Sequence, residues 1–147
     1  MVLKMSKSDL KWTPTLAELI DRLSIHQLKE VFIVEHKEKY AKEMLDIMHD
    51  INILIAEKNV KITAEIVRAI IVLSQINAHI WYNESKARKG ESQDLHLLRL
   101  THGINGIRNR AMNFISATIG DSRQDYKIDC LASEFKDWEI SLCVGGD

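Results

Sequence analysis

The scarcity of proline and glycine is the feature that most constrains the fold of this chain. Its 147 residues include one proline and six glycines, whereas a β-sandwich or barrel needs turn residues about every 8–12 positions. A hydrophobic content of 46% excludes a disordered chain. The remaining class is a helix-rich globule. The length predicts one helical domain over residues 1–147, with residues 1–12 and 143–147 loosely ordered.

Local start and stop signals divide the chain into four long helices. Thr15 and Glu18 form a capping-box pair at the first helix start. Residues suited to later helix boundaries are Asn59, Thr63 and Gly120. The expected helices cover approximately residues 15–34, 37–58, 63–89 and 92–120. Because the loops are short, we expect an all-α antiparallel bundle of four long helices, followed by a short C-terminal helix or an extended tail.

Charge and cysteine content restrict the partners. Twenty Lys and Arg residues balance twenty-one Asp and Glu residues, so no global field favours a nucleic-acid polymer or a membrane surface. No secretory signal or membrane-spanning run is visible, and Cys130 and Cys143 lack the spacing of a metal or disulfide site. We therefore expect a cytoplasmic protein without a cofactor. Residues 86–110 carry six cations against two acids, which allows a local anion site.

The third helix changes from aliphatic to polar along its core-facing side. Asn77, Trp81, Glu84 and Arg88 lie within about 60° of one another, on the side that carries Ile70 one or more turns earlier. An unpaired buried charge costs several kcal/mol, so such a stripe needs a reason. One reason is a pocket wall. The alternatives are that the bundle splays here and the stripe reaches water, or that Glu84 and Arg88 form an ordinary i,i+4 ion pair.

The fourth helix provides a candidate opposite wall. His102, Asn105 and Asn109 share one side, with Arg108 on the flank toward the apolar face. Asparagine and glycine are poor helix formers, and a segment that departs from local propensity this often favours a functional surface or close packing. In the first case, the amides bind polar edges of a ligand and Arg108 holds its anionic group. In the second, the asparagines are simply solvated.

Asp21 lies on an apolar stripe of the first helix. A carboxylate in such a place needs a cation, and Arg108 or Arg88 could supply it. The alternative to a ligand-binding role is therefore a structural ion pair inside the bundle. A metal site was also considered, because Glu43, Asp46 and Asp50 share one flank of the second helix. These acids flank the apolar stripe without interrupting it, so we expect a solvated face and no metal site.

Three segments resemble blocks of a known all-helical family. They are Leu-Ile-Asp-Arg-Leu-Ser-Ile at 19–25, Asn-Ala-His-Ile-Trp-Tyr-Asn-Glu-Ser-Lys-Ala-Arg at 77–88, and Thr-His-Gly-Ile-Asn-Gly-Ile-Arg-Asn at 101–109. The family is catalogued as domain of unknown function 4254, with relatives in bacteria and tailed phages. The matching positions are Asp21, Asn77, Trp81, Glu84, Arg88, Asn105, Arg108 and Asn109. A departure is Tyr82-Asn83, where the family pattern has a histidine before the acids.

The resemblance and the polar stripes together predict a binding protein. Some family members are associated with cell-surface sugar genes, which implies a nucleotide-sugar or sugar-phosphate ligand. Trp81 would stack on the ligand, Arg88 and Arg108 would contact phosphate, and the asparagines would bind polar edges. We expect non-catalytic binding of an anionic small molecule by a homo-oligomer, in one version a phage protein that sequesters a host nucleotide signal. The predicted site residues are Asp21, Asn77, Trp81, Glu84, Arg88, His102, Asn105, Arg108 and Asn109.

Two other functions stay open. One is a metal-dependent all-helical nucleotide pyrophosphohydrolase, for which Glu43, Asp46, Asp50 and Glu84 are the available acids, although the doubled glutamate block of such enzymes is missing. The other is a purely structural or oligomerisation subunit, in which the polar stripes are contacts between subunits.

Overall fold

The structure is a computed structural model and describes residue 6, residues 9–88 and residues 95–121. Within these ranges, the side chains of residues 87, 88 and 95–98 are not described. The predicted C-terminal helix or tail therefore lies outside the described residues. So do residues 143–147 and most of residues 1–8.

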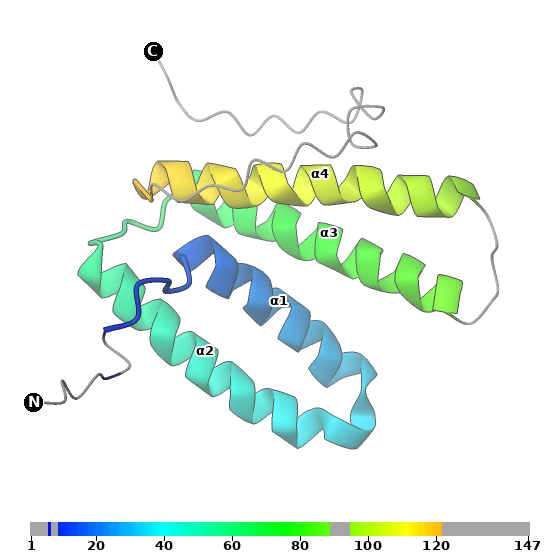
Figure 1. Ribbon diagram of the computed structural model, residues 1–147, viewed down its shortest axis with the longest axis horizontal. Coiled ribbons are helices and arrows are strands. Elements are labelled where there is room, and N and C mark those ends of the chain that lie inside the picture. Colours follow the sequence, from blue (N-terminus) through cyan, green and yellow to red (C-terminus); the bar gives the residue numbers. More distant parts are fainter. Residues whose placement is uncertain (1–5, 7–8, 89–94, 122–147) are drawn as a thin grey trace, which may run out of the picture.

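Four long helices form the described part of the chain (Figure 1). They are α1 (Leu16–Phe32), α2 (Lys37–Glu57), α3 (Ala64–Arg88) and α4 (Leu95–Thr118), with a short 3-10 turn, η2 (Val34–His36), between the first two. No strand occurs in these ranges, and none of these helices combines the length and apolarity needed to cross a membrane. The arrangement confirms the predicted all-α antiparallel bundle.

Local sequence signals mark the start of α1 and the ends of α2 and α4 as predicted. At the start of α1, the backbone N–H of Glu18 donates to Thr15 Oγ1 at 3.2 Å, and the N–H of Thr15 donates to Glu18 Oε2 at 3.1 Å. Asn59, just beyond α2, adopts a left-handed φ of 49°, which asparagine tolerates better than most residues. Gly120, just beyond α4, has a φ of 77°, as expected for a glycine after a helix.

The end of α1 differs slightly from the prediction. The helix was expected to reach about Val34, but it ends at Phe32. Ile33 leaves the helical region, with a φ of −111° and a ψ of 80°, and the 3-10 turn follows directly. The chain therefore reverses within a few residues and leads into α2.

The helix α1 occupies the centre of the bundle. It contacts α2, α3 and α4, while α3 and α4 also contact each other. Among the described elements, α2 packs only against α1 and the short turn before it. Figure 1 shows this arrangement, with α1 between α2 and the α3–α4 pair. This central position gives α1 neighbours on more than one side.

Three alanines, one from each helix, mark the closest packing of α1, α3 and α4. Ala17, Ala69 and Ala111 have at most 1% of their surface exposed. Because alanine has the smallest chiral side chain, helices can approach closely at these points. Leu73 and Ile115 fill the surrounding core and have 0% exposure. The apolar core therefore lies in the triangle of α1, α3 and α4, and α2 covers the outer side of α1.

Candidate ligand-binding site

A buried polar network lies one helical turn from the apolar core. Asp21 follows Ala17 by four residues, Asn77 follows Leu73 by four, and Arg108 precedes Ala111 by three. These spacings place each polar residue on the same side of its helix as a core residue. The core layer is thus followed directly by a layer of one carboxylate, one amide and one guanidinium.

Hydrogen bonds satisfy the carboxylate of Asp21. Arg108 donates to it twice, from Nε to Oδ1 at 3.0 Å and from Nη2 to Oδ2 at 2.5 Å. The Nδ2 of Asn77 donates to Oδ1 at 2.9 Å and lies 3.3 Å from the Ser24 hydroxyl oxygen. The Asp21 side chain is 9% exposed, so these bonds offset a desolvation cost of several kcal/mol. Arg108, one of the two predicted cation partners, forms an ion pair with Asp21.

A cavity of about 270 Å³ begins on the next turn. Its lining combines polar side chains from α3 and α4 with apolar side chains from α1. The lining residues are Ile25, Leu28, Asn77, Ile80, Trp81, Glu84, Asn105 and Arg108. Five of the nine predicted site residues therefore line one cavity, which we call the Trp81 cavity.

The chemistry of the Trp81 cavity combines an aromatic ring, two amides and opposite charges. The indole of Trp81 is half-buried and stacks against Phe32, with centroids 6.4 Å apart and planes 26° apart. Asn77 and Asn105 offer both donors and acceptors. Arg108 uses Nε and Nη2 for Asp21, and its Nη1 forms no hydrogen bond with a described residue. Glu84 is exposed and contributes a negative charge.

The remaining predicted residues lie elsewhere. Asp21 binds Arg108 and Asn77 but does not line the Trp81 cavity. His102 and Asn109 are half-buried on α4 and are not among the lining residues of this cavity. The side chain of Arg88 is outside the described residues, so its predicted phosphate contact stays a prediction.

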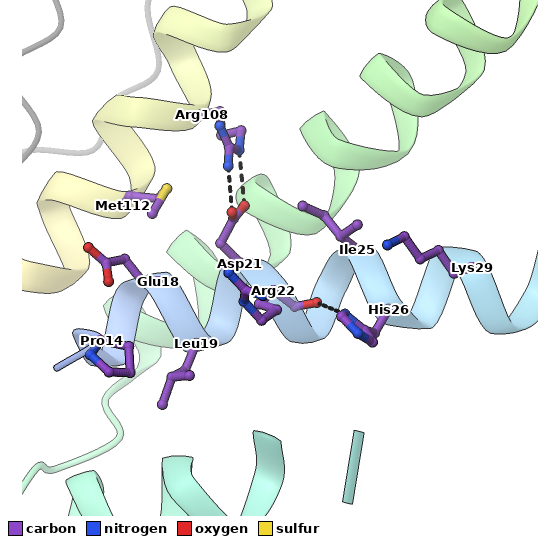
Figure 2. A pocket seen from close by; sticks show the side chains of 10 residues that line it. All are labelled: Pro14, Glu18, Leu19, Asp21, Arg22, Ile25, His26, Lys29, Arg108 and Met112. Carbon is purple, nitrogen blue, oxygen red and sulfur yellow. Dashed lines mark hydrogen bonds and ion pairs between the residues drawn. The ribbon is translucent and has the colours of Figure 1, made fainter. Parts of the chain in front are cut away.

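A second and larger concavity, of about 460 Å³, runs along α1 beside the Asp21–Arg108 pair (Figure 2). We call it the α1 groove. Its lining includes three residues that the sequence analysis did not select, Arg22, His26 and Lys29. These three residues have an i, i+4, i+7 spacing, which places them on one side of a helix, next to the stripe of Glu18, Asp21 and Ile25. This spacing is the sequence signal that could have grouped them. The other lining residues are Pro14, Leu19, Arg108 and Met112.

His26 joins the α1 groove to α2. Its Nδ1 is 3.0 Å from the carbonyl oxygen of Arg22, and its Nε2 is 2.8 Å from Glu43 Oε2. The carbonyl oxygen of Arg22 can only accept, so Nδ1 donates to it, and Nε2 lies within hydrogen-bond distance of the Glu43 carboxylate. The hydrogen bond from His26 holds the pKa of Glu43 below its usual value, with Lys39 and Lys29 adding smaller electrostatic contributions.

The acids of α2 do not assemble with the acid of α3. Glu43 is paired with His26, whereas Asp46 and Asp50 are exposed. In the described part of the chain, the backbones of α2 and α3 do not approach each other closely, so Glu84 and the acids of α2 do not lie on a closely packed helix pair. No group of three or more potential metal ligands occurs among the described residues.

An apolar groove between α1, α2 and α3 has a volume of about 480 Å³. This groove forms because α2 packs against α1 and leaves a space between α2 and α3. Its lining includes Ile20, Leu23, Met44, Met48 and Ile70. This groove is distinct from both polar concavities, which lie toward α4.

Comparison with family models, curated proteins and solved structures finds no match to this chain. The resemblance in the three sequence blocks therefore stays a prediction. The function has to be argued from the geometry of the site.

Proposed function

We propose that the protein binds, without chemical turnover, an anionic nucleotide-like or sugar-phosphate molecule between α1, α3 and α4. The main support for the proposal is that four predicted site residues line one cavity beside the Asp21–Arg108 ion pair. These residues are Asn77, Trp81, Asn105 and Arg108. These residues span 32 positions of the sequence, and the fold brings them together around one cavity. The proposal includes a cytoplasmic location, where such a protein would act by sequestering its ligand.

The dimensions of the Trp81 cavity suit one ring of such a ligand. Small-molecule pockets usually measure roughly 300–1,000 Å³, so a cavity of about 270 Å³ holds a base or a sugar and leaves the rest of the molecule outside. Stacking of a base on an aromatic side chain contributes about 1–3 kcal/mol. The amides of Asn77 and Asn105 supply hydrogen bonds that distinguish ring edges.

The structure gives less support to a pyrophosphohydrolase. That activity requires carboxylates from facing helices to hold metal ions between them. Here the acids of α2 are on a helix whose described backbone does not closely approach that of α3, and Glu43 is held by His26. Glu84 is the only one of the four candidate acids that lines the Trp81 cavity.

A thermal-shift panel of nucleosides, nucleotides, cyclic dinucleotides and nucleotide sugars tests the proposal. A ligand at a hundred times its Kd stabilises the folded state by about 2.7 kcal/mol, which is easily measured as an increase in Tm. The shift should be reduced in Asn105→Ala and retained in Asn113→Ala, a matched change on the same helix outside the cavity lining. The proposal fails if no compound shifts Tm, or if the two variants respond alike.

Oligomerisation is the second candidate role, and exposed apolar side chains on α2 and α3 favour it. Leu45 and Met48 on α2 and Ile71 on α3 are 63%, 41% and 50% exposed. On α2 the apolar stripe runs through Ala41, Leu45 and Met48, an i, i+4, i+7 spacing that suits packing against the same helix of a second copy. A dimer mass by light scattering that reverts to a monomer in Leu45→Glu would support this role. A monomeric wild-type protein would contradict it.

A further inference from the structure

We infer that the α1 groove is an anion-binding subsite, formed by Arg22, Lys29 and Arg108, for the diphosphate or phosphate part of an organic ligand. The sequence analysis assigned the phosphate contact to Arg88 and Arg108. The geometry points to a different set, because the carboxylate of Asp21 already occupies one edge of the Arg108 guanidinium. The connection of this subsite to the Trp81 cavity rests on the function proposed above.

More cationic than acidic side chains line the α1 groove. Arg22, Lys29 and Arg108 line it together with Glu18 and Asp21. Both acids are engaged within the fold, since Glu18 accepts the backbone N–H of Thr15 and Asp21 accepts from Arg108. The groove therefore offers positive charge that internal carboxylates do not fully compensate.

Arg22 and Lys29 are available to a ligand. The guanidinium of Arg22 forms no ion pair or hydrogen bond with a described residue, and the residue is exposed. Lys29 is half-buried, with its Nζ 5.6 Å from the centroid of the Tyr40 ring. Among the described residues no carboxylate forms an ion pair with Lys29, which acts on Glu43 only through longer-range electrostatics. His26 lies between the two along α1, and its Nε2 is engaged with Glu43.

Two features indicate an extended anion and not an isolated phosphate ion. Arg22 and Lys29 are seven residues apart, which is about 10 Å along a helix. Figure 2 shows Arg108 extending from α4 toward α1 at Asp21 and Lys29 farther along α1, past Ile25. A diphosphate, or a phosphate followed by a second polar group, has charge at more than one point along such a path. Its planar donor groups make arginine well suited to these oxygens.

The α1 groove and the Trp81 cavity share two lining residues, Ile25 and Arg108. A single molecule can therefore place its ring against Trp81 and extend its anionic part past Arg108 toward Arg22. Met112 and Ile25 give the groove an apolar side, against which charged hydrogen bonds are stronger than in open water. The implied ligand is a nucleoside or sugar diphosphate in preference to a cyclic monophosphate.

Titration with inorganic pyrophosphate at constant ionic strength tests the anion subsite. The full chain is used, and binding is followed by calorimetry and by the backbone amide NMR signals of α1. Arg22→Gln and Lys29→Gln should each weaken binding about tenfold, equivalent to about 1.4 kcal/mol. Lys42→Gln removes the same charge from an exposed position on α2 outside the groove and should leave the Kd within about twofold of wild type.

The outcomes separate this inference from the function proposed above. Absence of saturable pyrophosphate binding, or an equal loss in Lys42→Gln, overturns the anion subsite. If a neutral nucleoside or sugar still binds in that case, the Trp81 cavity stands alone. If pyrophosphate binds as described but no nucleoside or sugar competes for the Trp81 cavity, the anion subsite stands and the proposed ring-binding function fails.

Discussion

Arg108 of α4 donates to both carboxylate oxygens of Asp21 on α1, and the same Arg108 lines both the Trp81 cavity and the α1 groove. The pair has a structural role because Asp21 is almost fully buried. It also has a consequence for binding, since it fixes the orientation of the guanidinium that both concavities share. A change at Asp21 therefore affects stability and ligand contacts together.

Replacement of Asp21 by Ala should lower the free energy of unfolding by about 3 kcal/mol, because Arg108 and Asn77 lose their shared acceptor. Chemical denaturation with urea measures the change. Asp46→Ala is the matched control, since Asp46 is exposed, and should stay within about 0.5 kcal/mol of wild type. A loss below about 1 kcal/mol for the Asp21 variant would mean that the network contributes little.

Truncation of Leu73 to Ala should lower the free energy of unfolding by about 2–5 kcal/mol, because the residue is completely buried among α1, α3 and α4. Leu45→Ala removes the same atoms from a side chain that is 63% exposed and should change stability by about 0.5 kcal/mol or less in the monomer. Similar losses in the two variants would contradict the position of the core.

The start of α1 depends on its capping box. Thr15→Ala removes the side-chain acceptor for the N–H of Glu18 and should cost about 1 kcal/mol of stability. Thr15→Ser retains the hydroxyl and should recover most of that loss. Thermal denaturation by circular dichroism measures both variants, and an equally large loss in the serine variant would assign the effect to packing of the buried methyl group.

The hydrogen bond between His26 and Glu43 makes the α1–α2 contact sensitive to acid. It lowers the pKa of Glu43 in the folded protein below the ordinary value of 4.5. A group with a lowered folded pKa stabilises the fold above its unfolded pKa and loses this effect as pH falls through the folded value. The stability difference between wild type and Glu43→Gln should therefore be constant from pH 6 to about 5 and shrink below about 4.5.

Urea denaturation of both proteins at pH values from 6 to 3 measures this difference. Glu38→Gln, on the same helix, removes the same charge from an exposed residue and serves as the control. A stability difference for Glu43→Gln that stays unchanged down to pH 3 would show that the hydrogen bond does not favour the ionised carboxylate.

The helices themselves were predictable because their boundaries are encoded locally. The reciprocal bonds of Thr15 and Glu18, and the left-handed conformations of Asn59 and Gly120, depend on residues within a few positions. Helical periodicity likewise placed Asn77, Trp81 and Glu84 on one side of α3, and all three line the Trp81 cavity.

Contacts between helices were less accessible to sequence reasoning. Periodicity identifies the faces of a helix but not its neighbours, so it left both Arg88 and Arg108 as partners for Asp21. It also did not select Arg22 and Lys29, because the α1 groove arises only when α4 brings Arg108 and Met112 alongside α1. The distance between the described backbones of α2 and α3 has the same origin. Short loops predict antiparallel neighbours but do not determine the angle at which they pack.

The central position of α1 means that the bundle consists of two helical hairpins joined along one seam. The pairs α1–α2 and α3–α4 each unite sequence neighbours, while Asp21 finds its seam partners 56 and 87 positions later. A slip of one helical turn, about 5.4 Å, would separate the Asp21 carboxylate from Asn77 and Arg108 and leave it buried without partners. The apolar surfaces alone would tolerate several alignments. The polar network therefore favours one alignment of the two hairpins over the others. Both concavities depend on that alignment.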